Sequence, residues 1–200
     1  MRILGLTGDI ACGKSTVAKM LAEKGAATLD SDLLVRELYA DPGFSARVQA
    51  LFEESIVDEK QGVDRAKLGP LVFQNARKLR ELEALVHPAV ASLRAEKLRL
   101  LAAAGQKVVV VEAVKLLESG QGSACDAVWC IVCSPEVQIE RLMTRRGLSE
   151  AEAQARLQHQ PSRAQKQMWA GQTPLVWLEN NGSWDELCAL VAQKWTQFLA

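Results

Sequence analysis

The sequence predicts an α/β fold in which helices flank a parallel β-sheet. Short apolar runs with the character of buried strands alternate with helical segments along the chain. The amino-terminal part follows the order strand, glycine-containing loop, helix, strand, which favours a parallel βαβ unit. Polar residues such as Asp30 and Glu112 follow directly after strand candidates. Because ligands of open parallel sheets bind at the carboxyl ends of the strands, we expect the functional residues at that edge.

The first elements have clear boundaries. Arg2–Thr7 is an apolar run typical of a strand, and Gly8 begins a turn after it. Ser15–Lys24 has apolar residues at helical spacing, and Gly25 supplies a carboxy-terminal stop. Ala26–Leu29 is the second strand candidate.

The chain between residues 31 and 104 is mainly helical in pattern. Two polar breaks are expected as turns, at Asp41–Gly43 and Asp58–Asp64. Apolar residues recur at helical spacing up to Val86, and we expect His87-Pro88 to interrupt the helix there. Proline lacks an N–H and clashes with the preceding turn, so a new helix over Ala89–Ala104 is expected to follow it.

The remaining chain alternates again between strands and helices. Strands are expected at Lys107–Val111, Val128–Cys133 and Val176–Leu178. Helices are expected at Glu136–Arg146, Ser149–His159 and Trp184–Phe198. Ser149 has the side chain of a typical N-cap.

Composition excludes several classes of protein. The chain has 200 residues and a formal net charge of zero, which argues against a nucleic-acid-binding surface. No apolar run is long enough for a membrane span, and no secretion signal is visible, so we expect a cytoplasmic protein without a membrane partner. The odd number of cysteines, five, is typical of reduced thiols in that compartment. The sequence does not determine the oligomeric state, and a monomer is compatible with it.

The pair Cys130 and Cys133 has the spacing of a CxxC motif. It lies in a strand candidate, where an offset of three sends the side chains to opposite faces. We therefore expect these thiols to pack in the core rather than to form a metal or redox site.

The strongest motif is Gly8–Ser15, which matches GxxxxGK[ST] between a strand and a helix. Glycines let successive backbone N–H groups point inward as an anion nest, and the helix adds its positive end. Lys14 is expected to reach the β- and γ-phosphates of ATP, and Ser15 to bind Mg²⁺ as the cofactor. The expected ATP-binding residues are Gly8, Ala11, Cys12, Gly13, Lys14, Ser15, Thr16 and Arg145.

Asp32 and Arg36 form the second constellation. Asp32 follows the second strand candidate, and Arg36 lies four residues later on the same helical face. The carboxylate could accept or orient the proton of an acceptor hydroxyl, and Arg36 could hold an acceptor phosphate. A helix cap with an i,i+4 ion pair is the structural alternative, but a nearby phosphate loop favours the functional interpretation.

Three further groups complete the expected site. Glu112 stands where a carboxylate near Mg²⁺ or its water shell would stand, although a solvated strand-end acid has the same pattern. Arg141 and Arg145 lie one turn apart and could stabilise the charge of a transferred phosphoryl group from a mobile lid, or form a solvated basic face. His87 is either a ligand contact or a structural residue beside Pro88.

At these residues the sequence resembles the dephospho-coenzyme A kinase family along nearly its whole length. The motifs that carry the resemblance are Thr7–Thr16 (TGDIACGKST), Asp30-Ser-Asp32 with Arg36, Phe73 with His87-Pro88, Glu112–Glu118, Gln138–Arg156, Gln160 with Lys166, and Asn180–Gly182. Asp9 and Ala11 replace glycines usual in the family, and Cys12 replaces a serine. The extra negative charge of Asp9 beside a triphosphate is unexpected unless the carboxylate points away from it.

The resemblance implies ATP-dependent phosphorylation of the ribose 3′-hydroxyl of dephospho-coenzyme A. It implies that Asp32, Lys14 and Arg141 are catalytic, and that the acceptor is bound by Thr7, Asp32, Arg36, His87 and Glu112. It also implies the P-loop fold of nucleoside-monophosphate-kinase type, with a core over residues 1–43, 99–134 and 166–200, a helical acceptor-binding subdomain over 44–98 and a lid over 135–165.

Other P-loop proteins remain alternatives on the loop alone. Another small-molecule kinase could act on a nucleoside, a nucleotide or a shikimate-like alcohol. A GTPase-like switch would need an NKxD tetrapeptide, which does not occur here. An assembly ATPase would usually be longer or use an arginine from a neighbouring subunit.

Overall fold

The computed structural model describes all residues from Met1 to Ala200 and divides them into two compact units. The sheet unit comprises Met1–Thr28 and Ala104–Ala200, and the helical unit comprises Leu29–Ala103. The helical unit therefore begins earlier and ends later than the expected 44–98. Its first helix belongs with the others because Leu34 and Tyr39 lie in the same buried cluster as Phe44.

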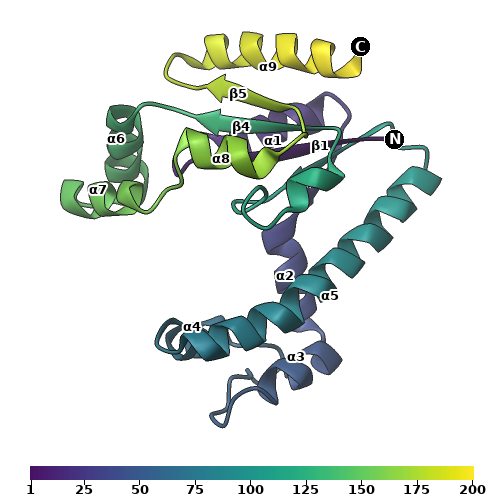
Figure 1. The fold of residues 1–200 in the computed structure, drawn as a ribbon, viewed down its shortest axis with the longest axis vertical. Coiled ribbons are helices and arrows are strands. Elements are labelled where there is room, and N and C mark those ends of the chain that lie inside the picture. Colours follow the sequence, from purple (N-terminus) through teal and green to yellow (C-terminus); the bar gives the residue numbers. More distant parts are fainter. The chain divides into compact units, whose positions relative to one another are not determined.

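A single parallel sheet runs through the fold, as the sequence predicts. The strands are β1 (Arg2–Gly8), β2 (Ala27–Asp30), β3 (Val108–Glu112), β4 (Ala127–Val132) and β5 (Leu175–Glu179), in the order β2-β3-β1-β4-β5. β1 pairs in parallel with β3 on one side and β4 on the other, and β5 continues the sheet beyond β4 (Figure 1). Thus the carboxyl ends of β1, β3 and β4 lie along one edge.

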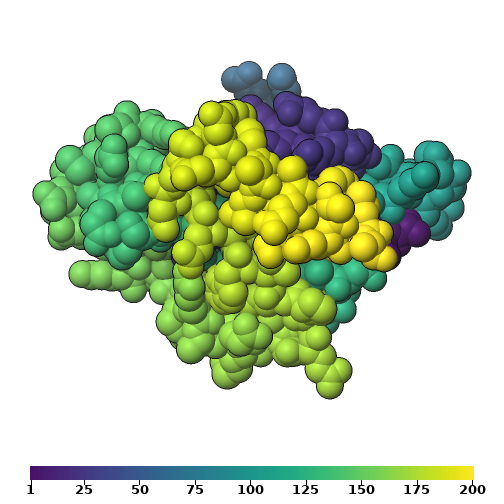
Figure 2. Space-filling view, turned by 90° about the horizontal axis from the view of Figure 1, so that it is seen from above, coloured from purple at the N-terminus to yellow at the C-terminus, as the bar shows by residue number.

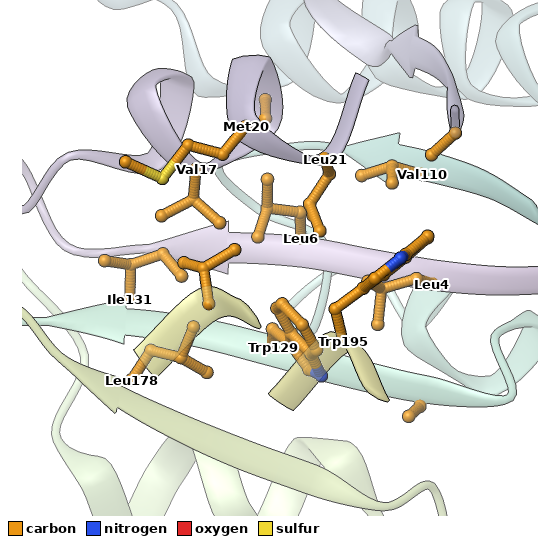
Figure 3. Close-up of a cluster of buried hydrophobic side chains, with 14 of the residues drawn as sticks. Leu4, Leu6, Val17, Met20, Leu21, Val110, Trp129, Ile131, Leu178 and Trp195 are labelled. Carbon is orange, nitrogen blue, oxygen red and sulfur yellow. The ribbon is translucent and has the colours of Figure 1, made fainter. Parts of the chain in front are cut away.

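Helices cover both faces of this sheet. α1 (Lys14–Glu23) and α9 (Trp184–Leu199) pack on one face, where Leu4, Trp129 and Trp195 are buried together (Figure 3). The other face buries Val111 and Val128 against the segment after β3 and against α8 (Arg163–Ala170). β3 and β4 are consequently buried at every residue, which explains their unbroken apolar sequences.

α6 (Pro135–Arg146) and α7 (Glu150–Gln158) form a separate pair at one end of the sheet unit. Figure 2 shows this pair in green beside α9, which lies in yellow on the surface of the unit. Gly147, in the left-handed conformation at φ 64°, ends α6, and Ser149 begins α7 with a capping box, as the sequence predicts. α8 and the short 3₁₀ helix Gln121–Ala124 were not predicted, although Ser162 and Gln165 form a second capping box at the start of α8.

The helical unit contains α2 (Ser31–Ala40), α3 (Pro42–Gln49), α4 (Arg65–Phe73) and α5 (Ala76–Ala103). The predicted turn at Asp41–Gly43 is instead the start of α3. The Asp41 carboxylate accepts a hydrogen bond from the Phe44 N–H at 2.7 Å, so Asp41 is the N-cap and Pro42 fills the first helical position.

The predicted interruption at His87-Pro88 is wrong, because α5 is one helix of 28 residues that runs through this dipeptide. Leu82 and Val86 before the proline and Val90 after it are all buried in the same cluster. Their packing holds both halves of the helix in line, and the lost hydrogen bond falls on an exposed face because Pro88 itself is exposed.

No helix of the structure is both long and apolar enough to span a membrane.

Candidate functional site

The loop between β1 and α1 is held by close packing at its glycines. A Cβ atom at Gly8 would lie 2.5 Å from the backbone oxygen of Ile131, so no side chain fits at this position. Gly13 adopts φ 96°, and a Cβ there would lie 2.7 Å from the amide nitrogen of Asn180. That amide donates to the Cys12 carbonyl at 2.8 Å, so the loop is tied to the end of β5 as well as to β1.

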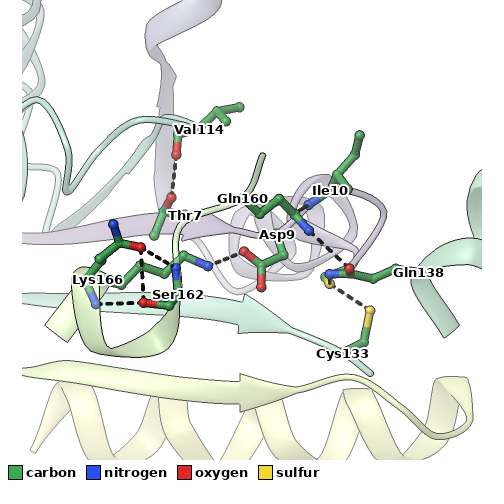
Figure 4. Close-up of polar contacts among 11 residues, drawn as sticks. Thr7, Asp9, Ile10, Val114, Cys133, Gln138, Gln160, Ser162 and Lys166 are labelled. Carbon is green, nitrogen blue, oxygen red and sulfur yellow. Dashed lines mark hydrogen bonds and ion pairs between the residues drawn. The ribbon is translucent and has the colours of Figure 1, made fainter. Parts of the chain in front are cut away.

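The three unusual loop residues have different surroundings. Ala11 adopts φ 60°, a conformation that glycine accepts more readily. Asp9 forms an ion pair with Lys166 of α8, so its carboxylate is neutralised by the protein itself (Figure 4). Cys12 is completely buried beneath the loop. The ion pair with Lys166 explains how the loop accommodates the extra negative charge of Asp9.

A cavity of about 780 Å³ opens beside the loop, within the sheet unit. It is lined by most of the expected ATP-binding residues, namely Gly8, Ala11, Gly13, Lys14, Ser15, Thr16 and Arg145, and not by Cys12. Its lining holds seven lysine and arginine side chains against two acidic ones. The volume suits a small-molecule ligand, and the excess of positive charge suits a polyanion such as a triphosphate.

Lys14 begins α1 and forms an ion pair with Glu112 at the end of β3. Both side chains are largely buried, with 17% and 9% of their surface exposed. The pair brings the expected phosphate-binding lysine and the expected carboxylate together, as the parallel order of β1 and β3 requires. Glu112 therefore lies at the phosphate loop, while Ser15 in the first turn of α1 is exposed and lines the cavity.

The arginines of α6 face the same cavity. Arg141, Arg145 and Arg146 all line it, together with Arg156 and His159 from the α7 segment. The Arg141 guanidinium donates to the Ala11 carbonyl at 3.5 Å, a long hydrogen bond that points it at the loop. This position favours the expected lid role over a purely solvated basic face.

A polar network connects the loop to α6 and α8 (Figure 4). The Ile10 N–H donates to the side-chain amide oxygen of Gln160 at 2.7 Å, and the side-chain amide nitrogen of Gln160 donates to the Gln138 side-chain oxygen at 3.2 Å. Gln138 in turn donates to the Cys12 sulfur at 3.1 Å. The sequence assigns no role to Gln138, Gln160 or Lys166, although all three stand in the family motifs, Gln138 at the start of Gln138–Arg156 and Gln160 with Lys166.

The Thr7 hydroxyl donates to the Val114 carbonyl at 2.9 Å and is buried. This hydrogen bond fixes the segment after β3 against β1, so Thr7 has a structural partner as well as a place in the cavity wall.

Asp32, Arg36 and His87 belong to the helical unit, and all three side chains are exposed. Asp30 is the N-cap of α2, because its carboxylate accepts from the Asp32 N–H at 2.8 Å. The helix cap of the structural alternative is thus present at Asp30, but Asp32 and Arg36 form no ion pair with each other. Their charges are free for another role.

Comparison with known proteins agrees with this geometry. The family model described as dephospho-CoA kinase matches residues 2–186. A curated dephospho-CoA kinase of Geobacter sulfurreducens is 38% identical over 199 residues and covers 98% of both chains.

Two solved structures show the same fold. The protein TT1252 from Thermus thermophilus superposes with a TM-score of 0.81 at 32% identity, covering 100% of this chain and 98% of that one. A shikimate kinase from Acinetobacter baumannii has a TM-score of 0.52 at 14% identity, with 100% and 93% covered, and shares the fold alone. The family match spans the loop, the helical unit and the arginine-bearing α6, and the chain belongs to the dephospho-CoA kinase family.

Proposed function

We propose that this protein transfers the γ-phosphoryl group of ATP to the ribose 3′-hydroxyl of dephospho-coenzyme A, the last step of coenzyme A synthesis. The observation that carries the proposal is a phosphate loop opening into a strongly cationic cavity, in a chain that matches this kinase family over most of its length. Because the five cysteines are free thiols, we also assign the protein to a reducing compartment, the cytoplasm.

Lys14 is the residue we assign to the β- and γ-phosphate oxygens. Its present partner, Glu112, holds the ammonium group at the end of the loop. When triphosphate enters, phosphate oxygens compete with Glu112 for this cation, and the ammonium group follows the negative charge that grows toward the β–γ bridging oxygen. The lysine is therefore stabilising both the bound nucleotide and the leaving ADP.

The Ser15 hydroxyl and the Glu112 carboxylate fit a Mg²⁺ ion that travels with ATP. Both supply oxygen ligands, which Mg²⁺ prefers, and no cluster of three or more metal-binding side chains exists. Mg²⁺ in such sites keeps most of its waters and binds phosphate oxygens, so one or two protein oxygens suffice. When bound, the ion neutralises charge on the β- and γ-phosphates.

Arg141 and Arg145 are assigned to the transferred group. Phosphoryl transfer spreads negative charge over three equatorial oxygens, and guanidinium groups bind such oxygens with parallel hydrogen bonds. Both arginines already line the cavity, and Arg141 points at the loop. We expect them to contribute more to the transition state than to ATP binding.

Asp32 is assigned to the acceptor hydroxyl. The 3′-oxygen forms a bond to the γ-phosphorus, the bond from that phosphorus to the β–γ bridging oxygen breaks, and Asp32 receives or orients the hydroxyl proton. Arg36 and His87, exposed on the same helical unit, are also assigned to the acceptor.

A thermal-shift screen tests this assignment of ligands. ATP with Mg²⁺ and dephospho-coenzyme A should each raise the melting temperature, because a ligand that binds only the folded state stabilises it. Shikimate and free nucleosides should leave it unchanged. Stabilisation by shikimate or a nucleoside, and none by dephospho-coenzyme A, would favour a different small-molecule kinase.

A further inference from the structure

Two thiols that are far apart in the sequence meet beneath the phosphate loop. Cys12 lies in the loop and Cys133 directly follows β4, 121 positions later, yet their sulfur atoms are 2.7 Å apart (Figure 4). The CxxC spacing of Cys130 and Cys133 draws attention to another pair. Cys130 is completely buried in the strand, whereas the contact of Cys133 is with Cys12.

The surroundings make Cys12 the more acidic of the two thiols. Hydrogen bonds donated by Cys133 and by the Gln138 amide hold the pKa of Cys12 below its ordinary value, although burial opposes them. The pKa of Cys133 is raised, first by its hydrogen bond to Cys12 and then by burial. A thiolate beside a second thiol is the arrangement that reacts in redox-sensitive cysteine pairs.

Cys130 and Cys188 have different surroundings. Burial raises the pKa of Cys130 to about 12, which keeps it protonated and unreactive. Cys188 lies on α9, against the core on the far side of the sheet from α8. Cys133 is half-buried rather than fully buried, so we expect a small oxidant to approach the pair from the side of Cys133.

We propose that Cys12 and Cys133 form a reversible disulfide when the protein meets hydrogen peroxide, and that this bond weakens ATP binding. Cys12 loses its proton and its sulfur attacks one peroxide oxygen, the O–O bond breaks, and the departing hydroxide takes up a proton to become water. The Cys133 sulfur then loses its proton and attacks the Cys12 sulfur, and the S–O bond breaks to release a second water. Two thiols are oxidised by two electrons, and one peroxide is reduced to two waters.

The effect on ATP follows from which partner can move. Cys133 is fixed at the end of β4, which is held between β1 and β5, while Cys12 is in the loop. A disulfide needs its sulfurs about 2.05 Å apart with a dihedral near 90°, so forming it draws the loop toward the strand. The Cys12 carbonyl accepts the hydrogen bond from Asn180, and Cys12 directly precedes Gly13. A shift of Cys12 therefore turns the loop N–H groups away from the phosphates. We expect kcat/KM for ATP to fall by about tenfold or more, mainly through KM.

The experiment treats the full-length reduced protein with an equimolar amount of hydrogen peroxide and maps its disulfides by mass spectrometry without reduction. The expected product is a Cys12–Cys133 linked peptide that disappears on treatment with dithiothreitol. Prior binding of ATP with Mg²⁺ should slow the reaction, because the occupied loop is held in place. Activity should fall with the cross-linked fraction and return on reduction.

Two variants complete the test. Cys133→Ser should keep the untreated activity and resist reversible inactivation, whereas Cys188→Ser should behave like the unmodified protein. A cross-link between other cysteines, or none at all, would overturn the proposal; so would a cross-linked protein with unchanged kcat/KM. The mapping needs no turnover and stands if Cys133→Ser does not fold. Only the effect on ATP rests on the proposed function. A direct measurement of nucleotide binding to the reduced and the cross-linked protein distinguishes a failure of the disulfide proposal from a failure of the proposed function.

Discussion

Charge at the phosphate loop is balanced residue by residue. Lys14 pairs with Glu112, and Asp9 pairs with Lys166, so two ion pairs flank the place where a triphosphate would bind. Each pair joins a residue of the loop or its helix to a residue more than ninety positions away. The protein thus holds its cations in position before any ligand arrives, which lowers the cost of organising them on binding.

Lys14→Ala should lower kcat/KM by about 10²-fold or more, because a cation at the transferred phosphates is removed. Lys19→Ala, an exposed position on the same helix, is the matched control and should retain activity. Steady-state kinetics and circular dichroism of both proteins make the comparison. Near-normal turnover by Lys14→Ala would remove the lysine from the mechanism.

Asp32→Asn should lower kcat by about 10²-fold or more if the carboxylate accepts the hydroxyl proton. The KM for ATP should change little, since ATP is assigned to the sheet unit. Glu37→Gln on the same helix is the control, because Glu37 takes part only in an exposed pair with Lys97. A decrease in kcat of only a few fold would leave Asp32 a positioning role.

Lys166→Met should destabilise the fold by about 2–4 kcal/mol, because it leaves the Asp9 carboxylate largely buried without its partner. The double variant Asp9→Asn/Lys166→Met should recover part of this loss, since the unpaired charge is gone. Urea denaturation of Lys166→Met, Asp9→Asn and the double variant gives the coupling energy. Additive losses would show that the pair contributes nothing as a pair.

At the scale of elements, the sequence predicts the sheet and the loop well because their signals are local. The four valines before Glu112 and the glycine pattern of Gly8–Ser15 each specify an element within a few residues. The failures have a common cause in tertiary contacts. Proline in α5 is tolerated because Leu82, Val86 and Val90 pack on one cluster, which no local rule contains.

The candidate site also contains some residues that local sequence signals predict and others that depend on tertiary contacts. Lys14, Ser15, Arg141 and Arg145 could be found from motif spacing, and all four line one cavity. The pairs Asp9–Lys166 and Cys12–Cys133 could not, because each depends on how distant segments meet around the loop. α8, which supplies Lys166, had only its capping box as a sequence signal.

Pro88→Ala should stabilise the helical unit by up to about 3 kcal/mol, because it restores one helical hydrogen bond and removes a clash. Glu96→Ala, exposed on the same helix, is the control and should shift stability by no more than about 0.5 kcal/mol. Thermal unfolding measures both. A loss of stability in Pro88→Ala would mean that the proline is required by the packing of α5.

At the scale of the whole molecule, the chain assigns different tasks to its two units. The sheet unit holds the phosphate loop, the cationic cavity and the arginines of α6. The helical unit holds Asp32, Arg36 and His87, whose exposed side chains have no structural partner that explains them. We propose that the first set binds the phosphate donor and that the second set binds the acceptor.

The identity of the acceptor decides what this kinase does, and a turnover assay with defined acceptors measures it. Purified protein with ATP and Mg²⁺ is given dephospho-coenzyme A, shikimate or a nucleoside, and ADP release is followed while the product is identified by mass spectrometry and ³¹P NMR. We expect ADP formation with dephospho-coenzyme A alone, matched by equimolar coenzyme A that carries the new phosphate on the ribose 3′-oxygen. No turnover of dephospho-coenzyme A by the folded protein, or faster turnover of another acceptor, would contradict this expectation.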